Sequence, residues 1–194
     1  KLPFEQDKLI TALLHANPNT VIINMSGSPV EMRNWVDQAH TLAQYWYSGT
    51  EGGTALAEML FGDVNPSGKL PVTFPKALED TPTVRFGEFP GDDTVHYREG
   101  IYVGYRYYDT FNVEPEFCFG HGLSYTDFSY HDLHVNISNN DHDEPIVNVT
   151  FSLTNTGSVA GAEVAQLYVS DSECTVERPK KELKQFAKIF LQPG

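Results

Sequence analysis

The sequence predicts an α/β domain followed by an antiparallel β-sandwich. Three observations support this fold class. Residues 4–75 alternate helical and strand patterns, as in largely parallel sheets covered by helices. Beyond residue 122, apolar and polar residues alternate over short segments, as in strands of a sandwich. The chain has 194 residues, 40% of them hydrophobic, enough for one large domain or two small ones.

The elements of the first part follow from local patterns. Residues 4–16 place apolar side chains near helical spacing and predict a helix that ends at an Asn-Pro pair. Residues 20–25 are β-branched and almost continuously apolar, so they predict a strand covered on both faces. A second helix is expected over residues 30–39, a second strand over 42–47, and a third helix over 54–61.

The remaining elements are shorter. Residues 69–74 predict a short strand, after which the pattern dissolves. Residues 76–96 contain several prolines and glycines and predict a long surface loop, of a length at which loops are often functional. Residues 128–137, 145–154 and 162–170 alternate apolar and polar side chains and predict the strands of the sandwich.

The charge balance limits the classes of partner. Asp and Glu number 26 against 13 Lys and Arg, which gives a formal net charge of −13. Nucleic-acid binding needs clustered basic side chains, so nucleic acid is not expected as a partner. An acidic surface also repels anionic lipid headgroups, whereas a neutral ligand is compatible with it.

Several kinds of site are excluded by the sequence. It contains none of the motifs of serine hydrolases, phosphate-binding loops, dinucleotide-binding folds or zinc proteases. Cys118 and Cys174 lie far apart, which excludes a paired-cysteine redox or metal site; one disulfide is possible but not indicated. No apolar run approaches the roughly 18–20 residues of a membrane span. We therefore expect no metal site and no membrane association.

Two loops are the best local candidates for a binding site. They cover residues 26–29 and 48–53, and each follows a predicted parallel strand, at the sheet edge where ligands gather. Their candidate residues are Ser26, Gly27, Ser28 and Glu51. The alternative is that the glycines only permit tight turns and that the carboxylate only favours a helix N-terminus.

A tyrosine-rich segment, residues 97–109, is the third candidate. Aromatic ring faces and charged groups directed at hydroxyls are typical of carbohydrate sites. Glu99 and Arg106 are its candidate binding residues, because they are charged groups among rings. Ordinary packing of a twisted strand or loop explains the same composition, and the sequence leaves both interpretations open.

Taken in order, the motifs resemble the C-terminal half of glycoside hydrolase family 3, the β-glucosidase and β-xylosidase family. The resemblance covers essentially the whole chain. It rests on residues 24–30 (NMSGSPV), 44–53 (QYWYSGTEGG), 60–75 (LFGDVNPSGKLPVTFP), 99–109 (EGIYVGYRYYD), 119–126 (FGHGLSYT), 155–157 (NTG), 163–169 (EVAQLYV) and 178–183 (RPKKEL).

The resemblance implies a three-layer α/β sandwich domain in residues 1–122, its start missing and with a long connecting loop in 76–122. Residues 123–194 would then be a fibronectin type III-like β-sandwich whose end is missing. The family's domain order also implies an N-terminal (β/α)8 barrel in the same enzyme as the partner of this chain.

The same resemblance locates the chemistry outside the chain. Family members are retaining glycosidases in which an Asp of the barrel is the nucleophile and a Glu of the second domain is the acid/base. That Glu is expected shortly upstream of the segment that begins at Leu2. We therefore assign no catalytic residue in this chain, and neither role is transferred to Glu5, Glu51 or Glu99. No cofactor is expected, because carboxylates perform both roles.

The predicted function is thus a non-catalytic part of an exo-acting β-glycosidase, most simply a β-glucosidase, that acts on neutral β-linked oligosaccharides or glycosides. A periplasmic or secreted location is typical of the family. Two alternatives belong to other classes. One is a stand-alone carbohydrate-binding or scaffold module, and the other is a structural interaction domain with no ligand, which would expose a large apolar patch.

Overall fold

The computed structural model describes residues 2–91, 93–140 and 142–194 and separates them into two units, each built from discontinuous parts of the sequence. The first unit comprises residues up to Ala55 together with Lys69–His121 and Gln166–Gln185. The second comprises Leu56–Gly68, Gly122–Ala165 and Phe186–Gly194.

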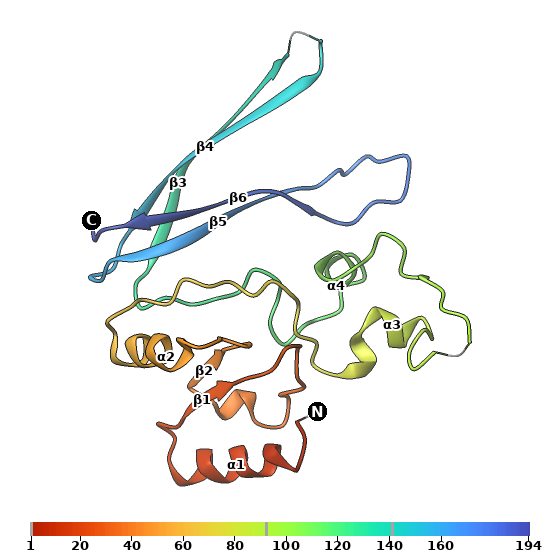
Figure 1. Ribbon diagram of the computed structural model, residues 1–194. Coiled ribbons are helices and arrows are strands. Elements are labelled where there is room, and N and C mark those ends of the chain that lie inside the picture. Colours follow the sequence, from red (N-terminus) through yellow and green to blue (C-terminus); the bar gives the residue numbers. More distant parts are fainter. Residues whose placement is uncertain (1, 92, 141) are drawn as a thin grey trace. The chain divides into compact units, whose positions relative to one another are not determined.

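The first unit begins with helix α1 (Gln6–Ala16) and the parallel strands β1 (Val21–Asn24) and β2 (Thr41–Gln44). Figure 1 shows the two strands side by side, in a register that places Val21 opposite Thr41. Apolar side chains of helix, strand and loops form one buried cluster: Leu14, Ile22, Met32, Trp35 and Phe74. The expected first helix, first strand and parallel pairing are confirmed.

The prediction of a helix over residues 30–39 is wrong. Only a short 3-10 helix, η1 (Val36–Gln38), forms there. The apolar spacing that predicted the helix instead inserts Met32 and Trp35 into the core, where the tryptophan is 1% exposed. Trp35 has a φ of −145°, which is not helical, and its indole Nε1 donates to Asp7 Oδ1 at 3.2 Å. Burial of a large ring has overridden the local helical pattern.

Two predicted strands are shorter than expected or absent. The second strand stops at Gln44, because Trp46 adopts a left-handed φ of 51° that no strand can continue. Residues 69–74 form no strand; Pro71 lacks the N–H that a ladder needs. Phe74 makes only an isolated bridge, in which its N–H donates to the Phe117 carbonyl at 2.8 Å.

The connecting loop expected over residues 76–122 contains helices. These are the 3-10 helix η2 (Leu78–Asp80), the single-turn α3 (Pro82–Arg85) and α4 (Tyr105–Thr110). Pro82 begins α3 at the position that tolerates a missing N–H. The third expected helix is confirmed as α2 (Gly52–Phe61).

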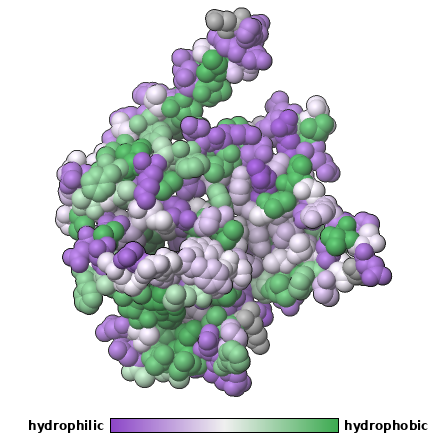
Figure 2. All heavy atoms as spheres, viewed as in Figure 1, coloured by the Kyte–Doolittle hydropathy of each residue, from purple (hydrophilic) through white to green (hydrophobic). Residues whose placement is uncertain are grey.

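The second half of the chain supplies two strand pairs. β3 (Phe128–Asn139) and β4 (Pro145–Asn155) form a long antiparallel hairpin, and β5 (Gly161–Val169) pairs with β6 (Glu182–Leu191). Three of these strands were expected, but β6 was not. Hydrophilic side chains cover the tip of the β3–β4 hairpin in Figure 2, and the alternating pattern of this hairpin leaves many of its apolar side chains exposed.

Asn155, at the end of β4, is 1% exposed, and both ends of its side-chain amide are hydrogen-bonded within the second unit. Its Oδ1 accepts from the Thr126 hydroxyl at 2.6 Å and from the Gly157 N–H at 3.1 Å. Its Nδ2 donates to the carbonyls of Val159 at 2.8 Å and Leu191 at 3.3 Å. One amide therefore connects β4, the turn after it and the end of β6.

Replacing this amide tests its importance. We expect Asn155→Ala to lower the free energy of unfolding by about 2–3 kcal/mol, because buried donors and acceptors lose their partner. Urea unfolding followed by circular dichroism measures the change. Asn148→Ala on the same strand is the control, since its side chain is exposed, and its effect should stay within about 0.5 kcal/mol. Equal losses in the two variants would contradict this account.

Candidate functional site

The two candidate loops leave the carboxyl ends of β1 and β2, and a side-chain network ties these ends together. Asn24 and Gln44 are register partners, and Asn24 Nδ2 donates to Gln44 Oε1 at 2.5 Å and to Ser26 Oγ at 2.9 Å. Gln44 Nε2 donates to the Ser26 carbonyl at 3.1 Å. The Ser26 hydroxyl donates onward to the Ser28 carbonyl at 2.8 Å. The first loop is thereby fixed to both strands.

The second loop is closed against the start of α2. The Tyr45 hydroxyl donates to the Gly52 carbonyl, and the Ser48 side chain lies over Gly52 so closely that any Cβ there would overlap the hydroxyl. A side chain at this position would require Ser48 to move. The exposed Glu51 carboxylate accepts from the Thr54 hydroxyl at 3.3 Å. It therefore lies at the N-terminus of α2, where negative charge is favoured.

Tyr47 also belongs to this edge, and sequence reasoning missed it. Its side chain is 80% exposed, whereas the preceding Trp46 packs edge-on against Phe74 with ring centroids 6.1 Å apart. A Cβ on Gly27 would come within 2.6 Å of Tyr47 Cε2. The tyrosine ring thus lies against the backbone of the first loop. Its place between two candidate loops was visible in the sequence, but its orientation was not.

Two tyrosines of the segment 97–109, Tyr107 and Tyr108, are buried. Tyr107 is 0% exposed, and Arg85 lies over its ring at 5.7 Å from the centroid while Arg85 Nη1 donates to its hydroxyl at 3.1 Å. Burial raises the pKa of Tyr108 to about 12. For the buried tyrosines, packing explains the composition.

The two charged candidates of this segment differ in their surroundings. Arg106 lies over the Tyr105 ring at 5.3 Å from the centroid, and its Nε is 3.5 Å from Glu182 Oε1. Glu99 is half-buried, and its backbone carbonyl accepts from the Tyr102 N–H at 2.9 Å. Arg106 is therefore already engaged within the chain.

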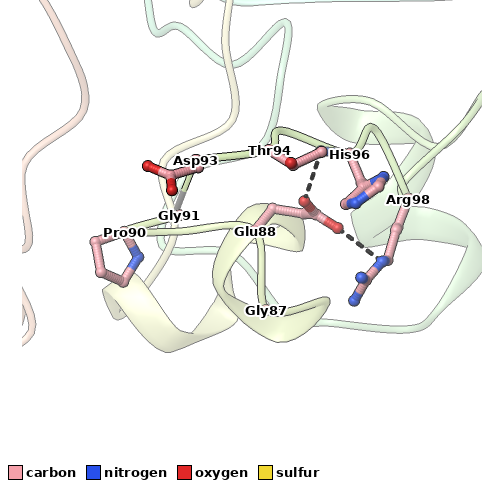
Figure 3. Close-up of a pocket in the computed structure, with 8 residues that line it drawn as sticks. All are labelled: Gly87, Glu88, Pro90, Gly91, Asp93, Thr94, His96 and Arg98. Atoms are coloured by element: carbon pink, nitrogen blue, oxygen red, sulfur yellow. Dashed lines mark hydrogen bonds and ion pairs between the residues drawn. The ribbon is translucent and has the colours of Figure 1, made fainter.

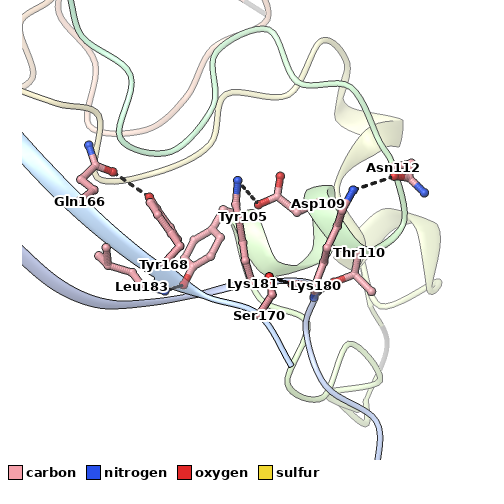
Figure 4. Close-up of polar contacts among 10 residues, drawn as sticks. All are labelled: Tyr105, Asp109, Thr110, Asn112, Gln166, Tyr168, Ser170, Lys180, Lys181 and Leu183. Atoms are coloured by element: carbon pink, nitrogen blue, oxygen red, sulfur yellow. Dashed lines mark hydrogen bonds and ion pairs between the residues drawn. The ribbon is translucent and has the colours of Figure 1, made fainter. Parts of the chain in front are cut away.

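Figure 4 shows the contacts between residues 178–183 and helix α4. Lys181 Nζ lies 3.2 Å from Asp109 Oδ2, and the Lys180 N–H donates to Thr110 Oγ1 at 3.0 Å. The Leu183 N–H donates to the Tyr105 hydroxyl at 2.8 Å. Residues that lie 70 to 78 positions apart in sequence are therefore bonded to each other.

A hollow of about 550 Å³ is lined by residues of the segments 87–91 and 93–98 (Figure 3). Its buried carboxylate, Glu88, lies 3.0 Å from Arg98 Nε and accepts from the His96 N–H at 3.1 Å. The acid is thus used to close the loop. The strand-end loops do not contribute to this hollow.

Among residues 2–91, 93–140 and 142–194, no group of three or more His, Cys, Asp or Glu side chains is arranged to hold a metal ion. In that same part of the chain, no helix has the length and apolar character needed to cross a bilayer.

Comparison with known proteins gives the family. Residues 1–105 match the Glycosyl hydrolase family 3 C-terminal domain, and residues 163–194 match the Fibronectin type III-like domain. This chain belongs to glycosyl hydrolase family 3. The resemblance predicted from its motifs is confirmed.

Its relatives are β-glucosidases. Over the whole chain, this family 3 sequence is 48% identical to Thermostable beta-glucosidase B of Acetivibrio thermocellus and 49% identical to Beta-glucosidase BoGH3A of Bacteroides ovatus. It covers 25% and 26% of those proteins. A crystal structure of a β-glucosidase from Kluyveromyces marxianus in complex with glucose matches all of the chain with a TM-score of 0.90 and 43% identity; the chain covers 23% of it. The chain therefore spans about a quarter of the length of its relatives.

The network at the strand ends can be tested by removing Gln44. We expect Gln44→Ala to lower the free energy of unfolding by about 1–3 kcal/mol, because Asn24 and Ser26 lose their shared partner. Thermal and urea unfolding measure this loss. The control is Gln38→Ala, which removes an exposed amide of the same unit; a loss as large in the control would argue against the network.

The contacts of Glu182 give a pH prediction. The hydrogen bond from Lys184, with the charges of Lys184 and Arg106, holds the pKa of this carboxyl below its usual value of 4.5. Because the folded-state pKa is lowered, the stabilisation is present above the unfolded-state pKa and is lost as pH falls through the folded-state pKa. A ¹³C NMR titration should show the lowered pKa, and Lys184→Gln should raise it. An unchanged carboxyl titration in that variant would contradict the assignment.

Proposed function

We propose that this chain is part of a retaining, exo-acting β-glycosidase, most simply a β-glucosidase, which hydrolyses terminal β-linked sugars by double displacement. The observation that carries the proposal is the 48% identity over the whole chain to Thermostable beta-glucosidase B. The TM-score of 0.90 against a β-glucosidase that binds glucose supports the same conclusion.

The catalytic carboxylates are proposed to lie outside these 194 residues. The nucleophile is an Asp of an N-terminal (β/α)8 barrel, and the acid/base is a Glu upstream of Leu2. A retaining mechanism needs these two carboxyl groups about 5–5.5 Å apart, so both must reach one cleft. The nucleophile forms a glycosyl-enzyme, and the acid/base first protonates the leaving oxygen and then activates water. No cofactor takes part in these steps.

In this proposal the present chain forms part of the wall of that cleft. Ser26, Gly27, Ser28 and Glu51 supply hydroxyl, backbone and carboxylate groups at the carboxyl ends of two parallel strands, where ligands of α/β folds bind. Such groups suit the hydroxyls of a neutral sugar, which an acidic chain does not repel.

Glu99 and Arg106 are proposed as further cleft residues. Arg106 has five donors, and its contact with Glu182 involves Nε, so other N–H groups remain for a sugar hydroxyl.

The finer architecture is also a proposal. Residues 1–122 would belong to a three-layer α/β sandwich, including the connecting segment 76–122, and residues 123–194 to a fibronectin type III-like sandwich to which further strands are added. The parallel β1–β2 pair and the antiparallel β3–β4 pair support the two classes of sheet. We propose a periplasmic or secreted location, as is common for enzymes that degrade oligosaccharides.

An activity assay tests the proposed location of the catalytic groups. The full-length protein should hydrolyse aryl β-glucosides, whereas the purified 194-residue chain should show no turnover above buffer, because neither carboxylate is present. Release of p-nitrophenol at 405 nm measures both. Turnover by the isolated chain that survives rigorous purification would place a catalytic pair within it and contradict the proposal.

A further inference from the structure

The ring of Tyr47 is presented to solvent by its two neighbours in the structure. Trp46 packs edge-on against Phe74 and has a left-handed φ of 51°, which ends the extended backbone that follows β2. The next side chain, Tyr47, is 80% exposed. Within the described part of the chain, its hydroxyl makes no hydrogen bond. A large aromatic side chain is thus exposed at the edge where the candidate loops meet.

Gly27 provides the surface on which this ring rests. An added Cβ would approach Tyr47 Cε2 to 2.6 Å and both Cζ and the hydroxyl oxygen to 3.1 Å. The ring therefore lies so close to the loop backbone that a Cβ at residue 27 would displace it. Gly27 itself is held by the bonds of Ser26 to Gln44 and to the Ser28 carbonyl. These contacts keep the ring in place without covering it.

The surroundings of the ring suit a sugar better than another protein surface. Ser28, Ser48, Thr50 and Glu51 are all exposed in the two loops. Protein interfaces favour aromatic side chains but are depleted of Ser and Glu. A pyranose ring, in contrast, has an apolar C–H face that stacks on an aromatic ring and a rim of hydroxyls that bond to polar side chains. Tyr47 and the loops supply both kinds of contact.

We propose that the Tyr47 ring stacks against a pyranose ring of the bound glycoside, and that contact with Gly27 fixes the position of the Tyr47 ring. This inference rests on the proposed function, because it assigns a binding residue to the same cleft wall. It makes Tyr47 a residue that determines affinity for sugar and takes no part in proton transfer.

The test uses the full-length protein with cellobiose as substrate and with thiocellobiose, its S-linked analogue that resists hydrolysis, as calorimetric ligand. Stacking contributions of about 0.5–1.5 kcal/mol correspond to roughly 2- to 12-fold in affinity. Tyr47→Ala should therefore raise the KM for cellobiose by about that factor and leave kcat within twofold. Tyr47→Phe should keep the wild-type KM, because it keeps the ring. Gly27→Ala should raise KM although the tyrosine is still present.

Phe4→Ala is the matched control, since Phe4 is an aromatic side chain that is 94% exposed in the same unit and lies outside every candidate segment; its KM should not change. Thermal unfolding of every variant identifies loss of folding. If Tyr47→Ala lowers the unfolding temperature and leaves KM and the calorimetric Kd unchanged, the ring packs against protein and the proposal is overturned.

The two proposals can fail separately. A wild-type protein that hydrolyses cellobiose, with the same KM and Kd in Tyr47→Ala, rejects the stacking contact alone. A wild-type protein that binds cellobiose without hydrolysing it, and binds it more weakly after Tyr47→Ala, rejects the glycosidase activity and supports the stacking contact. Absence of both binding and hydrolysis rejects both.

Discussion

The hydrogen bonds among Asn24, Gln44 and Ser26 are the constraint on which the candidate site depends. They join the carboxyl ends of two parallel strands that share only one short ladder. Because Asn24 is almost fully buried, its amide must be paired, and Gln44 and Ser26 supply the partners. The same bonds determine the path of the loop that contains Gly27. A binding surface at this edge is therefore as rigid as the strands that precede it.

A second constraint operates around α4. Tyr105, Asp109 and Thr110 of this helix are bonded to the segment that contains Lys180 and Lys181. Tyr107 and Tyr108 are buried, so these tyrosines contribute to packing. Arg106 makes both kinds of contact, because it lies over the Tyr105 ring and pairs with Glu182. Carboxylates outnumber basic side chains in this protein, and two basic side chains near α4 each lie beside one: Arg106 beside Glu182 and Lys181 beside Asp109.

Periodicity and strand–helix order predicted α1, β1, the parallel pairing and both loops of the site from the sequence. The helix expected at residues 30–39 failed because Met32 and Trp35 have helical spacing but are inserted separately into the core. The orientation of Tyr47 could not be predicted from the sequence for a related reason. It depends on the left-handed backbone of Trp46 and on a close approach to Gly27, neither of which has a signature in composition or periodicity. The motifs identified the family, but the geometry of the site became visible only in the three-dimensional structure.

Covalent trapping of the nucleophile tests the central claim most directly. In a retaining glycosidase, a 2-deoxy-2-fluoro-β-glucoside with a good leaving group leaves a long-lived glycosyl-enzyme on the nucleophile. Digestion and mass spectrometry of the labelled full-length protein then locate the modified residue. The account predicts a label on an Asp outside these 194 residues, with every peptide of this chain unmodified. A label on any carboxylate within the chain would contradict it.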